Sequence, residues 1–268
     1  IAPDARGGSM GDIGAATEAD VYSQYWNPAK YPFNVARAGV GISYTPWLRK
    51  IVSDINLANI TGFYRIGDYS AVSASLRYFN LGEVYIGDYS GGITDMTIKP
   101  YELAVDVGYS RMLSETFSMG VNMRFIYSDI RVDPYNAASS AGKAFAADIA
   151  MYRLGYFMMG NRECSLGWGI NISNIGSKIA FGGSDDAEFI PTNLRLGLNL
   201  TVPMNEFNKF SFSVEANKLL IPTYPKRGEN ELEVDYETRV QKDYYDISPI
   251  AGIFKSFSDA PGGFKEEM

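Results

Sequence analysis

The sequence predicts an all-β protein, specifically a transmembrane antiparallel β-barrel of the bacterial outer-membrane type. Three observations support this fold class: segments of about ten residues alternate apolar and polar side chains, the connections between them alternate between short and long, and aromatic residues are abundant. The chain has 268 residues, of which 14% are aromatic, with nineteen Tyr and fifteen Phe. A Tyr-rich composition suits the girdles that such barrels place between lipid and water.

The clearest strand runs from Phe117 to Tyr127, where apolar or aromatic side chains mostly alternate with small or polar ones. At about 3.3 Å per residue and a tilt of about 40°, this segment spans roughly the apolar height of an outer membrane. The polar face of this strand and its relatives carries charges that suit a wet lumen, namely Arg77, Asp106, Arg124, Asp148, Arg195 and Glu215. The alternative is a soluble sandwich or barrel, which would hide its apolar face and expose charge.

The same pattern predicts about nine wall strands. They fall near residues 38–46, 55–66, 70–86, 99–112, 117–132, 143–157, 165–178, 192–203 and 209–222. Short turns follow the second, fourth, sixth and eighth strands, and longer connections follow the others. This alternation predicts that the short turns face the periplasm and the long loops face outside. An odd number of strands cannot close such a barrel, so we expect further strands after Met268.

The two ends of the chain differ from the wall strands at 37–222. Residues 1–36 do not alternate, and we expect an irregular segment with at most a short helix, packed in the barrel mouth. Residues 223–268 are expected to form an extracellular region. Within it, Glu231–Val240 alternates and predicts a β-ribbon above the membrane, whereas Ser248 followed by Pro249 predicts the start of a short amphipathic helix that ends near Ser258.

Composition argues against several functions. The chain has no histidine, so a Ser-His-Asp triad, an imidazole base and the usual catalytic zinc site are not expected. Its one cysteine permits neither an internal disulfide nor a thiolate cluster. The net charge is −7 and the basic residues are scattered, which argues against nucleic-acid binding. We therefore predict no catalytic residue, no metal site and no cofactor.

Three segments carry a resemblance to a known family. They are APDARGGSMGDIGAAT (Ala2–Thr17), SQYWNPAKY (Ser23–Tyr31) and GIFKSFSDAPGGFKEE (Gly252–Glu267). Together they resemble the PorV (LptO) family of the Bacteroidetes type IX secretion system, which belongs to the wider group of FadL-like outer-membrane barrels. The resemblance implies a barrel of fourteen strands with an N-terminal segment in its lumen.

The resemblance also implies a function and a set of partners. PorV-like proteins associate with the giant translocon barrel (Sov/SprA-like), receive cargo that carries a C-terminal type IX signal domain, and deliver it to the attachment complex that contains the PorU sortase. Outer-membrane lipid and lipopolysaccharide complete the expected partners. The alternative function is a FadL-type channel for hydrophobic small molecules.

Partner contacts are predicted at apolar and aromatic residues of the outward loops. These residues are Trp47, Leu48, Ile93, Met96, Ile253, Phe254 and Phe257. The alternative for each is burial within its own loop or against the barrel rim. The mostly polar lumen positions favour the secretion role over the channel.

Overall fold

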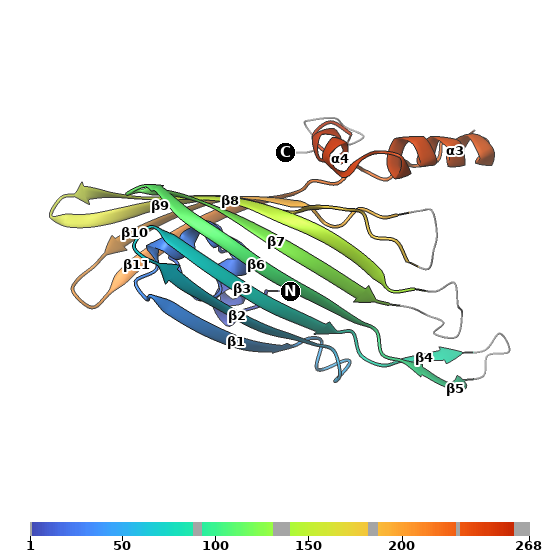
Figure 1. Cartoon of the computed structure of the whole chain (residues 1–268), viewed down its shortest axis with the longest axis horizontal. Helices are drawn as coiled ribbons and strands as arrows, with labels where there is room; N and C mark the ends of the chain where they lie inside the picture. Colours follow the sequence, from blue (N-terminus) through green and yellow to red (C-terminus); the bar gives the residue numbers. More distant parts are fainter. Residues whose placement is uncertain (1, 88–92, 131–139, 182–186, 229–230, 260–268) are drawn as a thin grey trace.

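A curved antiparallel sheet of nine strands forms the wall of the molecule in the computed structural model (Figure 1). The structure describes residues 2–87, 93–130, 140–181, 187–228 and 231–259. The wall strands, in their order across the sheet, are β1 (Ala38–Pro46), β2 (Asn56–Ile66), β3 (Ser70–Asn80), β6 (Tyr101–Ser114), β7 (Phe117–Asp129), β8 (Gly142–Met159), β9 (Arg162–Gly176), β10 (Asn193–Pro203) and β11 (Lys209–Leu219). The all-β class and the nine strands are confirmed.

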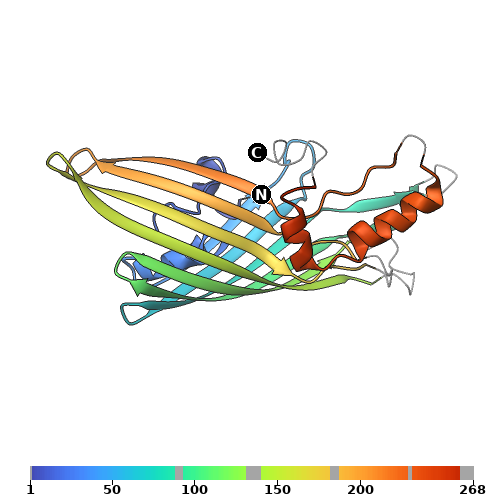
Figure 2. The same cartoon turned by 90° about the horizontal axis from the view of Figure 1, so that it is seen from above.

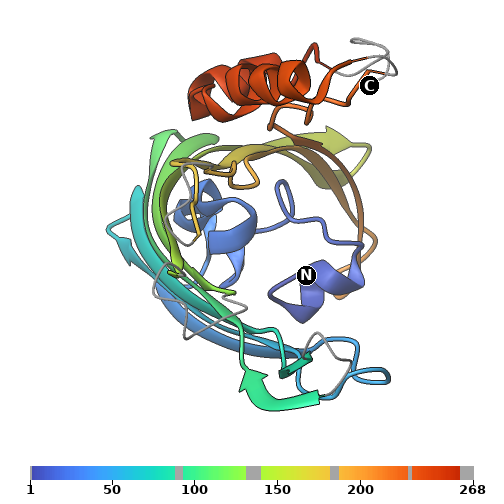
Figure 3. The ribbon, with the colours of Figure 1, turned by 90° about the vertical axis from the view of Figure 1, so that its right-hand side faces the viewer.

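Within the described residues the sheet is an open arc, with β1 and β11 at its two edges (Figure 3). Every neighbouring pair is antiparallel, and each strand pairs with the next along the wall. No helix in the described part of the chain has the length and apolar content needed to cross a membrane.

The two faces of the wall follow the predicted alternation. On β7, Val121 is 53% exposed on the outer face, whereas Asn122 is completely buried on the concave face. The concave face also buries Asp106 and Asp148, while Val107 and Ile149 are exposed on the outside. Because apolar side chains cover the convex surface and polar ones fill the interior, the sheet is inverted relative to a water-soluble barrel.

One strand of the prediction was too long. The segment expected at 70–86 ends as β3 at Asn80, and the chain then forms a separate two-stranded ribbon of β4 (Val84–Gly87) and β5 (Ile93–Ile98). The break falls at Gly82, whose φ of +86° lies in the left-handed region that glycine adopts without strain. The ribbon extends beyond the end of the wall in Figure 1.

The N-terminal segment lies against the concave face of the sheet (Figure 3). It contains more helix than expected, with α1 (Ala5–Ser9), α2 (Ser23–Trp26) and the 3₁₀ helix η1 (Pro28–Phe33). The Asp4 side chain accepts from the Gly7 N–H at 2.7 Å, and the Asn27 side chain accepts from the Ala29 N–H at 3.0 Å. These N-caps, together with Pro28 at the first position of η1, explain the short helices.

The predicted ribbon at Glu231–Val240 is wrong, because this segment is the helix α3 (Glu233–Val240), which continues as a π-helical turn over Gln241–Tyr245. Acidic residues occupy the first turn of α3 and Arg239 the last, which suits the helix dipole. Arg239 also reaches back to Glu231 at 2.7 Å. Hydrogen bonds from Arg239 lower the pKa of the Glu231 carboxyl to about 2.

The helix predicted after Ser248 is confirmed as α4 (Pro249–Lys255). The Ser248 side chain accepts from the Ala251 N–H at 3.3 Å, as an N-cap does, and Pro249 occupies the first helical position. Figure 3 shows α3 and α4 outside the arc of the wall, on the convex side.

Candidate functional site

A fully buried cluster of charged and amide side chains lies on the concave face of β6, β7 and β8. The Arg124 guanidinium donates to Asp148 at 2.8 and 3.2 Å, and it also pairs with Asp106. The Asn122 amide donates to both carboxylates, at 3.1 Å to Asp106 and 3.0 Å to Asp148. Charges buried in this way persist because each is paired and hydrogen-bonded. The cluster therefore ties three strands together inside the wall.

The N-terminal segment is joined to this cluster and to the wall by hydrogen bonds. The Gln24 amide donates to the Asn122 side chain at 2.8 Å, and the Asn27 amide donates to the Met151 carbonyl at 2.9 Å. From the wall, the Asn171 amide donates to the Trp26 carbonyl at 3.0 Å. We call residues 2–36 the plug, because they occupy the concave side of the wall and bond to several of its strands.

A second attachment uses buried and half-buried charges. The Glu215 carboxylate on β11 accepts from the backbone N–H groups of Gly14 and Ala15, at 2.9 and 2.8 Å. The Lys30 ammonium is completely buried and donates to the Gly14 carbonyl at 2.7 Å and to Thr17 at 3.1 Å. The loop around Gly14 is thus held on its N–H side by the wall and on its carbonyl side by the plug itself.

The wall is shaped to receive this loop. Gly169 on β9 and Gly197 on β10 are direct neighbours in the sheet, and both face the plug. A Cβ atom at Gly169 would overlap the Ala15 carbonyl, and one at Gly197 would lie 3.0 Å from the Ala16 backbone nitrogen. The pair forms a flat seat against which the plug backbone packs.

We expect Gly169→Ala to loosen the plug without unfolding the wall, because the added methyl group meets plug backbone rather than a flexible side chain. Limited proteolysis of the purified protein should then cleave the plug faster than in the parent. Gly155→Ala on β8 is the matched control, since a Cβ there would be 3.9 Å from its nearest neighbour. Equal cleavage rates in both variants would show that the plug does not depend on this seat.

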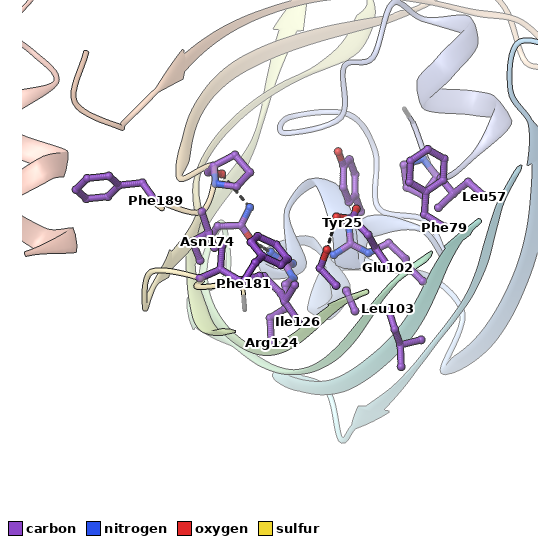
Figure 4. A pocket seen from close by; sticks show the side chains of 17 residues that line it. Tyr25, Leu57, Phe79, Glu102, Leu103, Arg124, Ile126, Asn174, Phe181 and Phe189 are labelled. Carbon is purple, nitrogen blue, oxygen red and sulfur yellow. Dashed lines mark hydrogen bonds between the residues drawn. The ribbon is translucent and has the colours of Figure 1, made fainter. Parts of the chain in front are cut away.

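A cavity of about 370 Å³ lies on the concave side, between the plug and the ends of the strands that lead into the long connections (Figure 4). Arg77 and Arg124 line it together with the Tyr25 ring. Most of the remaining lining is apolar and includes Leu57, Phe79, Leu103, Ile126, Phe181 and Ile190. The expectation of a mostly polar lumen therefore does not hold at this level, because Leu57, Phe79 and Ile126 place large apolar side chains at inward positions near these strand ends.

Tyr25 of the plug lies between two arginines of the wall. The Arg77 guanidinium carbon is 5.0 Å from the centre of the Tyr25 ring, and that of Arg195 is 4.9 Å from it. Stacking of this kind stabilises a guanidinium that is removed from water. The alternation of the strands identified both arginines as lumen residues, but nothing in the sequence placed Tyr25 between them.

The outer helices are anchored to the wall by the connection between β9 and β10. The Lys178 ammonium donates to the carbonyls of Tyr244 and Tyr245, at 3.0 and 2.7 Å. It also lies 4.0 Å from the centre of the Phe189 ring. A Cβ atom at Gly252 would be 2.8 Å from that same ring, so α4 packs closely on Phe189. This contact fixes α4 at the rim.

The predicted contact residues do not form one surface. Phe254 is 73% exposed on α4, whereas Ile253 and Phe257 are half-buried. Trp47 and Leu48 are exposed in the connection between β1 and β2, which lies across the opening from the outer helices (Figure 3). Ile93 and Met96 lie in β5, but their side chains are outside the described part of the structure.

The wall has an apolar outer face and a polar interior, the plug lies inside it, and the helices α3 and α4 lie outside at its rim. These features define the class of protein as a bacterial outer-membrane β-barrel. The chain matches the family described as "Type IX secretion system protein PorV" over residues 1–226, which is most of its length. It therefore belongs to the PorV family of type IX secretion. A comparison with curated proteins gave no match.

Proposed function

We propose that this chain is an outer-membrane shuttle and scaffold of type IX secretion, which receives cargo from the translocon and passes it to the surface attachment complex. The proposed partners are the giant translocon barrel (Sov/SprA-like), the PorU sortase complex, cargo with C-terminal type IX signal domains, and surrounding lipid and lipopolysaccharide. The family supports a role in type IX secretion. The steps of cargo transfer and the individual partners are our proposal.

One observation favours the shuttle function over the channel function. The plug is bonded to both edges of the arc, to the Ile42 carbonyl on β1 through the Tyr22 hydroxyl and to Glu215 on β11 through the Gly14 and Ala15 N–H groups, and it contains the buried Lys30. Moving it would break several buried hydrogen bonds at once, each costly to leave unmade. A protein that works through contacts at its rim needs no such movement. The exposed Phe254 on the anchored helix α4 is the kind of side chain that such a contact uses.

The cavity next to Tyr25 favours a second candidate, a FadL-type channel for hydrophobic small molecules. Its lining combines apolar side chains with two arginines, a combination that suits an amphiphile with a negative head. Access through the barrel would still require displacement of the plug.

A deletion strain separates the two functions. If the chain is a shuttle, loss of the gene should abolish surface display of type IX cargo while uptake of a fluorescent fatty acid stays normal. Re-expression of the parent chain should restore display. Normal cargo display combined with reduced fatty-acid uptake would contradict the shuttle and support the channel.

A further inference from the structure

The strand β8 extends past its neighbour β7 at the end of the wall that carries the short turns. β7 begins at Phe117, which pairs with Arg153 of β8, and the last hydrogen bond on this side joins the Leu154 N–H to the Thr116 carbonyl at 2.9 Å. β8 continues to Met159 and stays paired with β9 as far as Arg162. The hairpin tip therefore projects beyond the turn that precedes β7 (Figure 2). Within the described residues, Gly155–Met159 is paired on one side only.

The backbone groups on the unpaired side can be assigned from the alternation of an antiparallel ladder. Because the Leu154 N–H points toward β7, the N–H and C=O groups of Tyr156 and Met158 point the same way. Those of Phe157 and Met159 point to β9, with which these residues are paired. The tip thus presents two N–H and two C=O groups along a free edge. Lipid tails cannot bond to such groups, so this edge lies outside the hydrocarbon layer.

The side chains of the same segment are apolar on both faces. On the concave face Tyr156 is 63% exposed and Met158 is 64% exposed, whereas Tyr152, further along that face, is buried beneath the plug. On the outer face Phe157 is 40% exposed and Met159 is 51% exposed. Free strand edges in native proteins are usually protected by lysine, proline or a bulge. The segment from Gly155 to Met159 contains neither residue, and its pairing with β9 is regular.

We propose that the free edge at Gly155–Met159 is a strand-addition site for an extended, apolar segment of a different protein. Such a segment would bond to the N–H and C=O groups of Tyr156 and Met158 while its side chains pack on those of the tip. The flexible thioethers of Met158 and Met159 suit a surface that adapts to a partner. A second copy of this chain is a poor occupant. All copies share one orientation in a membrane, so two β8 edges could pair only in the less stable parallel sense.

Hydrogen exchange tests the proposal directly. We expect the amides of Tyr156 and Met158 to exchange about tenfold more slowly, or slower still, in native outer-membrane vesicles than in the purified protein. The amides of Phe157 and Met159 are the internal controls, because their bonds to β9 persist in both samples. Equal exchange of Tyr156 and Met158 in vesicles and in purified protein would overturn the proposal.

A pair of variants at one position distinguishes backbone pairing at the free edge from nonspecific hydrophobic binding. Met158→Pro removes one N–H from the free edge and is tolerated there by the sheet, whereas Met158→Ala removes the side chain but keeps the N–H. Heat-modifiable migration confirms that each barrel is assembled. In native gels of membrane extracts, the proline variant should lose the high-mass assembly that the alanine variant largely keeps. Equal migration of the two variants would show that the backbone edge binds no partner.

Discussion

Replacing Asp148 with alanine is expected to destabilise the wall by about 3–5 kcal/mol, which is the cost of leaving a buried charge without its partner. Asp148 is completely buried and accepts from Arg124, from the Asn122 amide at 3.0 Å and from the Asn174 N–H at 2.8 Å. Removing it leaves Arg124 and Arg77 to share Asp106 as the one remaining carboxylate of the cluster, so one buried positive charge is uncompensated. Reversible urea unfolding of the refolded barrel measures the loss.

Two further variants test the reason for that loss. Asp148→Asn keeps the shape and one acceptor, so we expect it to be milder than Asp148→Ala. The double variant Asp148→Ala, Arg124→Met should lose less than the sum of its single variants, because it removes the orphaned charge as well. A loss below about 1 kcal/mol for Asp148→Ala would mean that the cluster contributes little to stability.

Val121→Arg is expected to destabilise the barrel by about 2–4 kcal/mol, since this side chain faces lipid near the middle of β7. Val121→Leu keeps the position apolar and is the matched control, with an expected change within about 0.5 kcal/mol. The alternation alone suggests that Asn122→Arg, on the lumen side, would destabilise the barrel only slightly. The structure revises this, because Asn122 is completely buried among Gln24, Asp106 and Asp148. Similar stability of Val121→Arg and Val121→Leu would contradict a lipid-facing β7.

The wall was predictable from the sequence because alternation is a local property of each strand. Ser118 and Asn122, for example, follow from the same period that exposes Val121, and the structure places them as expected. The start of α4 was predictable for the same reason, because the signal consists of two adjacent residues, Ser248 and Pro249.

The failures arose where distant residues decide the outcome. The segment that forms α3 alternates charged with apolar side chains, which fits a ribbon. In the structure, however, Arg239 in the last turn of α3 pairs with Glu231, which precedes the helix, and the Tyr236 hydroxyl donates to the Pro225 carbonyl at 3.1 Å. The seat at Gly169 depends on a plug residue more than 150 positions earlier, and the free edge of β8 depends on where β7 begins. The residues around Gly169 and those of β8 therefore do not by themselves predict the seat or the free edge.

A triple variant tests the shuttle mechanism most directly. It changes Ile253 and Phe254 of α4 and Phe257, two residues after α4 ends, to serine, and we call it the α4 variant. Losing one buried aromatic contact costs about 1.5–3 kcal/mol, so even Phe254→Ser alone should weaken a rim complex by about 10- to 150-fold. Phe207→Ser is the matched control, because Phe207 is 90% exposed in the short turn between β10 and β11. Barrel abundance and heat-modifiable migration are measured first in each strain. With equal barrel levels, the account predicts that type IX cargo fails to reach the surface in the α4 variant and reaches it normally in Phe207→Ser. Normal cargo display in the α4 variant would contradict it.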